Sequence, residues 1–171
     1  MRRINSFAPI ARADARVLIL GSMPGIASLS AGQYYAHVRN AFWPILGHLL
    51  GFDAAAPYPV RLAALQEARV AVWDVLQSCQ REGSLDTNIE RDSEIANDFP
   101  RFFRRHPQVT HVFFNGGAAE TTFRRHVLPA LAAPGLHLTR LPSTSPANAS
   151  FSFERKLVAW RAVLAPLALP R

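Results

Sequence analysis

The chain has 171 residues, of which 49% are hydrophobic and 18% are charged. This length is typical of one domain, so we expect a single domain over residues 1–171, and the composition excludes a disordered or collagen-like chain. No apolar run reaches the ~18–20 residues of a membrane-spanning helix, which predicts a soluble protein without a membrane partner.

The charge balance is strongly positive: 19 lysines and arginines face 12 acidic residues, for a net charge of +7, and Lys156 is the only lysine. This balance favours a polyanionic partner such as nucleic acid, although compositional bias of a genome toward arginine would leave the same pattern. The single Cys79 cannot form an internal disulfide, and residues 1–12 are too polar for an export signal. We therefore expect a protein of the cytoplasm.

Four short apolar runs predict strands, and they cover residues 17–21, 70–75, 109–115 and 136–141. Segments with helical spacing cover residues 42–50, 60–67, 92–105, 118–131 and 153–164. This alternation predicts an α/β fold with a mostly parallel, four-stranded sheet and helices on both faces, because a helix supplies the crossover that parallel strands need. Ligands bind beyond the carboxyl ends of such strands, so the residues that follow each run are candidates for a site.

The first predicted strand leads into a turn with the sequence Gly-Ser-Met-Pro-Gly, residues 21–25. Glycine and proline turns of this kind let the main chain approach a ligand closely, and they also occur as plain strand-to-loop turns. The turn is not a nucleophile elbow, because that motif needs serine at the position of Met23. We therefore do not expect a hydrolase of the Ser-His-Asp type.

The next loop, residues 33–44, combines four aromatic side chains with Arg39 and Asn40. Aromatic faces beside a cation and a carboxamide suit a planar, polar base. The alternative is a hydrophobic plug in which Asn40 only caps the following helix.

Polar residues also follow the later strands. Asn115, after the third strand, offers a donor and an acceptor to a base edge, or caps the next helix. The loop 143–148, after the fourth strand, presents hydroxyls and main-chain amides that suit phosphate oxygens, or is a plain linker. Asp74 and Asp86 are the carboxylates nearest the expected cleft, and helix capping or a structural hydrogen bond is the simpler role for each. The histidines lack the spacing of a metal site, so we expect no metal.

In this order the segments resemble the uracil-DNA glycosylase superfamily, and most closely its hypoxanthine-DNA (deoxyinosine) glycosylase branch. The resemblance spans nearly the whole chain. Its fragments are residues 5–9, 21–25, 33–37, 40–43, 73–76, 84–89, 114–116 and 141–148.

The resemblance implies a three-layer α/β/α enzyme that hydrolyses the N-glycosidic bond of a deaminated base in DNA, foremost hypoxanthine, and leaves an abasic site. It implies no metal and no cofactor. The expected partner is double-stranded DNA, with single strands left open as a substrate, and the expected state is a monomer in the cytoplasm, associated with the nucleoid. The target nucleotide must leave the base stack, because the bond is inaccessible inside a duplex.

The resemblance also implies roles for individual residues. Asn40 and Asn115 are the expected catalytic residues, and Asn115 also reads the base edge. Phe42 is the expected stacking partner of the base, and the remaining base-binding residues are Met23, Gly25 and Tyr35. The loop expected to hold the DNA backbone and fill the vacated stack comprises Ser143, Thr144, Ser145, Pro146, Ala147 and Asn148. Asp74 and Asp86 are expected to support these groups from behind.

One position departs from the pattern. Related families place Asp or Asn where Met23 stands and use it to activate the attacking water, which a thioether cannot do comparably. Asn40 is therefore expected to hold the water or the departing base. Two alternatives stay open: a glycosylase directed to uracil or to several deaminated bases, and an inactive DNA- or nucleotide-binding module on the same scaffold.

Overall fold

A computed structural model describes residues 2–132 and 135–168 of the chain. Its centre is a four-stranded sheet in the order β3-β2-β6-β7, in which every neighbouring pair is parallel. The strands are β2 (Val17–Gly21), β3 (Val70–Asp74), β6 (His111–Asn115) and β7 (His137–Leu141). They coincide with the four predicted runs to within two residues at each end, so the predicted parallel sheet is confirmed.

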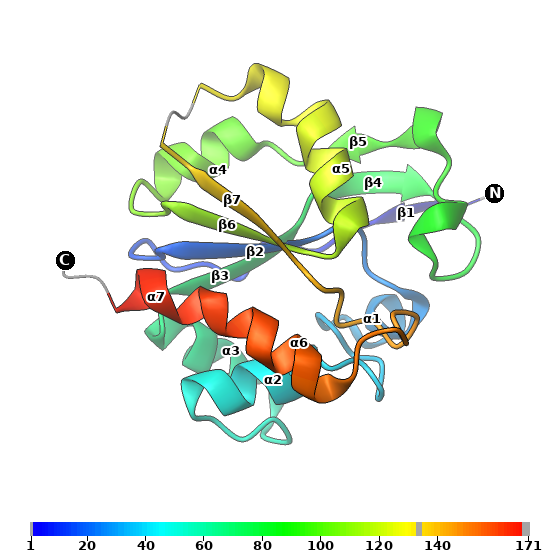
Figure 1. The fold of residues 1–171 in the computed structure, drawn as a ribbon. Helices are drawn as coiled ribbons and strands as arrows, with labels where there is room; N and C mark the ends of the chain where they lie inside the picture. The colour runs from blue at the N-terminus through cyan, green and yellow to red at the C-terminus, as the bar shows by residue number, and fades with distance from the viewer. Residues whose placement is uncertain (1, 133–134, 169–171) are drawn as a thin grey trace.

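Helices cover both faces of this sheet, as Figure 1 shows. On one face lie α2 (Phe42–Leu50), α3 (Tyr58–Glu67), α6 (Phe153–Trp160) and α7 (Leu164–Leu167), and on the other lie α4 (Phe99–Arg105) and α5 (Gly117–His126). Successive strand residues point to opposite faces. Val17 and Ile19 therefore pack into one core and Leu18 and Leu20 into the other, which explains why β2 is apolar throughout, whereas β7 at the edge is mostly exposed and carries polar residues. The three-layer α/β/α architecture is confirmed.

A second, smaller sheet was not predicted. It is antiparallel in the order β1-β4-β5, with β1 (Arg3–Asn5), β4 (Leu76–Gln80) and β5 (Ile95–Ala96). Only Val75 separates β4 from β3, so the chain passes directly from one sheet to the other. Leu76 and Cys79 of β4 form a small core with Met23, and this core supports the turn that follows β2.

Three predicted helices differ in their bounds. The segment 92–105 is helical only from Phe99, because Asp98 caps the helix by accepting from the Arg101 N–H at 3.1 Å, and residues before the cap form β5 and a 3₁₀ turn at Arg91–Ser93. The segment 118–131 ends as an α-helix at His126 and continues as a 3₁₀ turn. The segment 153–164 breaks after Trp160. A short helix, α1 (Ile26–Ala31), was not predicted.

Within the described parts of the chain, no helix combines the length and apolarity needed to cross a bilayer.

Candidate active site

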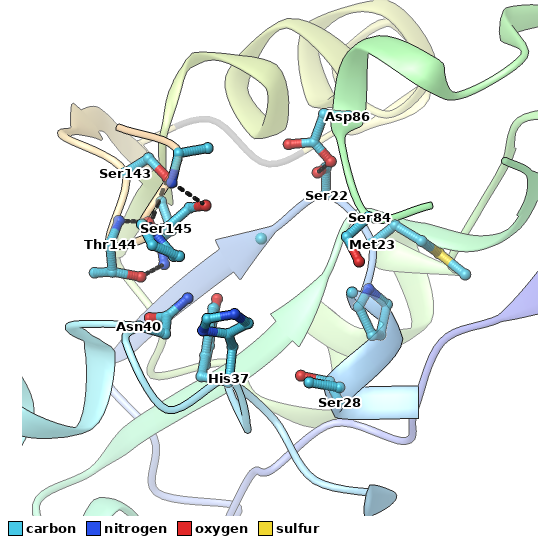
Figure 2. A pocket seen from close by; sticks show the side chains of 18 of the residues that line it. Ser22, Met23, Ser28, His37, Asn40, Ser84, Asp86, Ser143, Thr144 and Ser145 are labelled. Atoms are coloured by element: carbon cyan, nitrogen blue, oxygen red, sulfur yellow. Dashed lines mark hydrogen bonds between the residues drawn. The ribbon is translucent and has the colours of Figure 1, made fainter. Parts of the chain in front are cut away.

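The carboxyl ends of the parallel strands open on a cavity of about 310 Å³, which lies at the small end of the range for small-molecule sites. Gly21, Asp74 and Asn115, the last residues of β2, β3 and β6, line it. Loops from distant parts of the sequence complete the walls, as Figure 2 shows. Of the candidate residues, those that line the cavity are Met23, Gly25, Tyr35, Asn40, Asp74, Asp86, Asn115, Ser143, Thr144, Ser145, Pro146 and Ala147.

Gly21 is the point at which the cavity admits no side chain. A Cβ atom on this residue would lie 2.6 Å from Asp74 Oδ1 and 3.0 Å from Tyr35 Oη. Two polar side chains from separate segments therefore converge on the main chain of β2, and glycine is required because anything larger would collide with them.

Met23 turns its side chain away from the cavity. The side chain is buried against Leu76 and Cys79, and Figure 2 shows its sulfur pointing outward from the centre of the site. Arg81 braces the same turn, since its Nη2 donates to the Pro24 carbonyl at 2.6 Å. Met23 thus contributes only main-chain atoms to the cavity. Its side chain cannot replace the Asp or Asn that related families place at this position.

Asn40 lies just before Ala41, the N-cap of α2, and also faces the cavity. Its Oδ1 accepts from the Phe42 N–H at 2.9 Å, at the beginning of α2. This bond fixes the plane of the carboxamide and leaves Nδ2 as a donor on the cavity side, where Figure 2 draws it. The capping and the functional interpretations of Asn40 are therefore compatible.

Asn115 is clamped by Thr144. Its Oδ1 accepts from the Thr144 N–H and its Nδ2 donates to the Thr144 Oγ1, both at 2.9 Å. Thr144 is 1% exposed, and its carbonyl accepts from the Ala41 N–H at 3.0 Å. One hydrogen on Nδ2 and one lone pair on Oδ1 remain for a ligand. Thr144 therefore holds the Asn115 carboxamide in one orientation and ties its own loop to the main chain next to Asn40.

The loop 143–148 is braced by its own polar groups. Ser143 Oγ accepts from the Ser145 N–H and Asn148 Nδ2 donates to the Ser143 carbonyl, at 3.2 and 3.1 Å. The buried Lys156 of α6 donates to the Ser145 carbonyl at 3.3 Å. Asn148 does not line the cavity but a second hollow beside it, which also reaches Asn115, Ser143 and the start of α5.

Tyr35, and not Phe42, meets the cavity. Phe42 is fully buried in the core, and the ring of Tyr35 stacks on it at a centroid distance of 4.0 Å and an angle of 20°. Tyr35 has φ of 55°, a left-handed conformation that is uncommon for a side chain of this size. The structure thus brings Asn40, Asn115 and Tyr35 together around one cavity and leaves Phe42 behind Tyr35.

Two carboxylates approach the cavity in different environments. Asp86 is exposed, and its Oδ1 accepts from the Ser22 hydroxyl at 2.6 Å. Asp74 is 4% exposed, and its Oδ2 has no hydrogen-bond partner among the described residues. Burial foremost, and then the charge of Asp86, raise the pKa of Asp74 to about 7, and Arg81 opposes the increase. Asp74 is therefore substantially protonated at neutral pH.

Several contributors were missed from the sequence. Ser28 Oγ accepts from the Ala36 N–H at 3.1 Å and Ser84 Oγ accepts from the Ile26 N–H at 2.9 Å, and these bonds shape the cavity wall. His37 also lines the cavity. Isolated serines in loops carry no signal for such roles, whereas Gly21 could have been noticed as the last residue of an apolar strand.

The described residues include no group of three or more His, Cys, Asp or Glu side chains that could hold a metal ion.

Comparison with known proteins gives consistent results. A family model described as the uracil DNA glycosylase superfamily matches residues 8–164. A protein of Methanosarcina barkeri named hypoxanthine DNA glycosylase is 38% identical over 143 residues, covering 83% of this chain and 86% of that protein. A protein of the same name from Methanosarcina acetivorans is 35% identical over 158 residues, covering 92% and 95%. A solution NMR structure of a Methanosarcina acetivorans protein, described as a uracil DNA glycosylase, aligns with a TM-score of 0.82 and 32% identity over 98% of this chain and all of that one.

Proposed function

Because the chain belongs to the uracil DNA glycosylase superfamily and is a monofunctional DNA glycosylase for deaminated bases, we propose that hypoxanthine, carried in DNA as deoxyinosine, is the base it releases. Water replaces the base at C1′ and leaves an abasic site. The observation that carries the proposal is the convergence of Asn40, Asn115 and Tyr35 on one cavity at the carboxyl ends of the sheet. Both relatives named above as hypoxanthine DNA glycosylases point to the same base.

The chemistry needs hydrogen-bond donors aimed at the base. As the C1′–N9 bond stretches, the sugar becomes cationic and the base takes up the electron pair. A positioned donor in a dry site lowers such a barrier by ~3–4 kcal/mol. Asn40 Nδ2 and the free hydrogen of Asn115 Nδ2 are the donors we assign to this role, with the main chain of Met23 and Gly25 beside them.

The base is held by stacking. Tyr35 lines the cavity, and Phe42 stacks on one face of its ring, so we assign the opposite face to the base. An aromatic pair of this kind offers a rigid surface to a flipped purine, worth about 1–3 kcal/mol per stacked base. We therefore assign direct stacking to Tyr35 and indirect support to Phe42.

Water activation has no carboxylate at position 23, since Met23 packs into the small core. We assign the attacking water to Asn40, whose carboxamide is fixed at the mouth of the cavity by its bond to the Phe42 N–H. Orientation without deprotonation suffices for a sugar that is already cationic, because such a centre reacts with neutral water.

DNA is the substrate, and we propose that the duplex approaches over the loop 143–148 and the loop around Val38, whose side chain is 95% exposed. Exposed hydroxyls and amides of the first loop suit phosphate oxygens, and the net charge of +7 attracts the polyanion. We propose further that the enzyme acts as a monomer on double-stranded DNA in the cytoplasm, at the nucleoid.

The only lysine, Lys156, is bonded to the Ser145 carbonyl, so it is not available as an amine nucleophile.

The test is a panel of duplex oligonucleotides that contain hypoxanthine, uracil, xanthine or adenine at one position. Single-turnover release should be fastest for hypoxanthine, and Asn40→Ala and Asn115→Ala should each lower its rate about 10²–10³-fold. Asn5→Ala is the matched control, because Asn5 is an exposed residue of β1 outside the cavity. Full activity of Asn40→Ala with intact folding would remove Asn40 from the mechanism, and faster release of uracil would replace the assigned substrate.

A further inference from the structure

Two polar atoms at the floor of the cavity are not explained by the folded chain. Tyr35 Oη and Asp74 Oδ2 are both buried and without a hydrogen-bond partner among the described residues, as is Nη1 of Arg81, which does not line the cavity. Asn115 lies near enough to Tyr35 to affect its pKa, but outside hydrogen-bond geometry. Buried polar groups are nearly always paired, so two orphans in one recess indicate a site that something else completes.

The Asp74 and Tyr35 side chains converge above Gly21. Asp74 Oδ1 and Tyr35 Oη approach the same point above Gly21, at 2.6 and 3.0 Å, and both residues line the cavity. Because Oδ2 is enclosed without a donor, ionised Asp74 would be an unsatisfied buried anion, which costs several kcal/mol. The neutral acid avoids that cost. We assign its proton to Oδ1, the oxygen that approaches Gly21 in the cavity lining, and leave Oδ2 as the buried carbonyl oxygen.

Resting on the proposed function, we propose that Asp74 is a catalytic residue that acts as a neutral carboxylic acid and donates a hydrogen bond from Oδ1 to the carbonyl oxygen of the deaminated base. Deamination replaces an exocyclic amino group, which is a donor, by a carbonyl oxygen, which is an acceptor. A neutral Asp74 therefore matches hypoxanthine and opposes adenine. An ionised Asp74 would do the reverse, so its protonation state sets the base preference.

The reaction balances without an added group. The C1′–N9 bond breaks and its electron pair leaves with the base, while the hydrogen bond from Asp74 strengthens as negative charge spreads to the carbonyl oxygen. Water forms the new C1′–O bond, and its proton neutralises the departing base. Asp74 keeps its own proton throughout. The Asp74 side chain thus stabilises the departing base from the cavity floor. The Met23 side chain, in contrast, gives no help to the attacking water.

Of the groups that face Asp74, Arg81 alone favours the ionised state, and the others favour the neutral acid or leave it intact. Asp86 disfavours a second negative charge, and Tyr34 and Tyr35 carry none at neutral pH because burial raises the pKa of both. The buried Arg81 opposes protonation but does not form a hydrogen bond with Asp74. Gly21 and Asn115, on the neighbouring strands, do not titrate. A base that fills the cavity removes water and shifts Asp74 further toward the neutral form.

The experiment measures single-turnover release of hypoxanthine from pH 5.5 to 9 by the wild type, Asp74→Asn and Asp74→Ala. The amide is the permanently neutral analogue of the acid, since it retains a donor and cannot lose a proton. We expect Asp74→Ala to be about 10²–10³-fold slower than the wild type at pH 6. Asp74→Asn should stay within about tenfold at pH 6 and should lack the loss of rate that the wild type shows above its midpoint. Asp92→Asn, an exposed carboxylate outside the cavity, is the matched control.

A second readout does not depend on turnover. Binding of duplexes that carry uncleavable 2′-fluoro analogues of deoxyinosine or deoxyadenosine is followed by fluorescence anisotropy at pH 6 and 8. The wild-type preference for the carbonyl base should shrink as the pH rises, and Asp74→Ala should abolish that pH dependence. Tyr35→Phe removes an unpartnered hydroxyl without loss of a protein contact, and Tyr34→Phe, whose hydroxyl donates to the Ala8 carbonyl at 2.8 Å, serves as its control.

The outcomes separate the two proposals. A wild type that releases no deaminated base refutes the proposed function, while the binding arm still decides the role of Asp74. A rate that rises with pH, together with Asp74→Asn as slow as Asp74→Ala, would identify Asp74 as an ionised base and overturn the inference. Wild-type rates and binding in Asp74→Ala would also overturn it.

Discussion

Asp74→Asn should stabilise the folded protein at alkaline pH. Burial raises the pKa of Asp74 from 3.8 to about 7, so the folded chain holds this proton over a range in which the unfolded chain has released it. The associated stability is fully present below pH 3.8 and is lost as the pH rises to about 7. At ~1.4 kcal/mol for each pH unit between the two values, the total loss is about 4 kcal/mol.

Only part of that loss falls in an accessible range. Between about pH 5.5 and about pH 8.5 the two titrations leave a change of about 2 kcal/mol, which corresponds to about 1 M in the urea midpoint for an ordinary m-value. Equilibrium unfolding in urea should therefore show the wild type losing stability across this range faster than Asp74→Asn. The variant should be the more stable protein at the upper end, because its amide is never ionised.

The comparison has a sharp negative outcome. Every other titrating group is common to both proteins, so their stability curves should converge at acid pH and diverge above it. Parallel curves across the whole range would mean that Asp74 titrates alike in the folded and unfolded chains. That result would refute both the burial argument and the neutral acid in the mechanism.

Three further changes have defined outcomes. Gly21→Ala places a methyl group 2.6 and 3.0 Å from two polar side chains, and single-turnover release should fall at least ~10²-fold as the cavity floor is displaced. Thr144→Val leaves the Asn115 Nδ2 without its buried acceptor and should lower the free energy of unfolding in urea by about 1–3 kcal/mol. Arg39→Gln should weaken binding to all duplexes and reduce the slope of log K against log salt by about 1, whereas Arg12→Gln, already paired with Asp14, should leave the slope unchanged.

The sequence was sufficient for the central sheet because β2, β3 and β6 are largely buried and correspondingly apolar, although β7 at the edge is mostly exposed. The second sheet could not be predicted, since β1 has three residues, β5 has two and β4 carries glutamines and a serine. The helix predicted over residues 92–105 was wrong in its first half for a local reason: the α-helix begins only after its N-cap, Asp98. Whether short strands pair and where helices are capped depends on which segments of the chain meet in the fold. The hydrophobic periodicity of one segment carries no information about that.

The site divides in the same way. The positions of Asn40, Asn115 and Asp74 after predicted strands or before a helix were enough to nominate them. The exchange of Phe42 for Tyr35 at the cavity was not predictable, because it depends on the left-handed backbone at Tyr35. That Asp74 Oδ2 has no partner among the described residues is likewise a property of packing, visible only when the surrounding segments are in place.

The arrangement of the strand ends is consistent with a reaction in which the side chain at position 23 takes no part. Gly21 pairs in register with Asp74 on one side and lies level with Asn115 on the other, since Leu20 pairs with Phe114. At ~4.8 Å between neighbouring strands, the α-carbons of Asp74 and Asn115 stand roughly 10 Å apart with a bare glycine between them. A base lowered into this slot meets a carboxyl group on one flank and a carboxamide on the other. With the two proposed donors on these flanks, the charge of the leaving group would spread over two contacts, and the barrier would fall without a water-activating side chain at position 23.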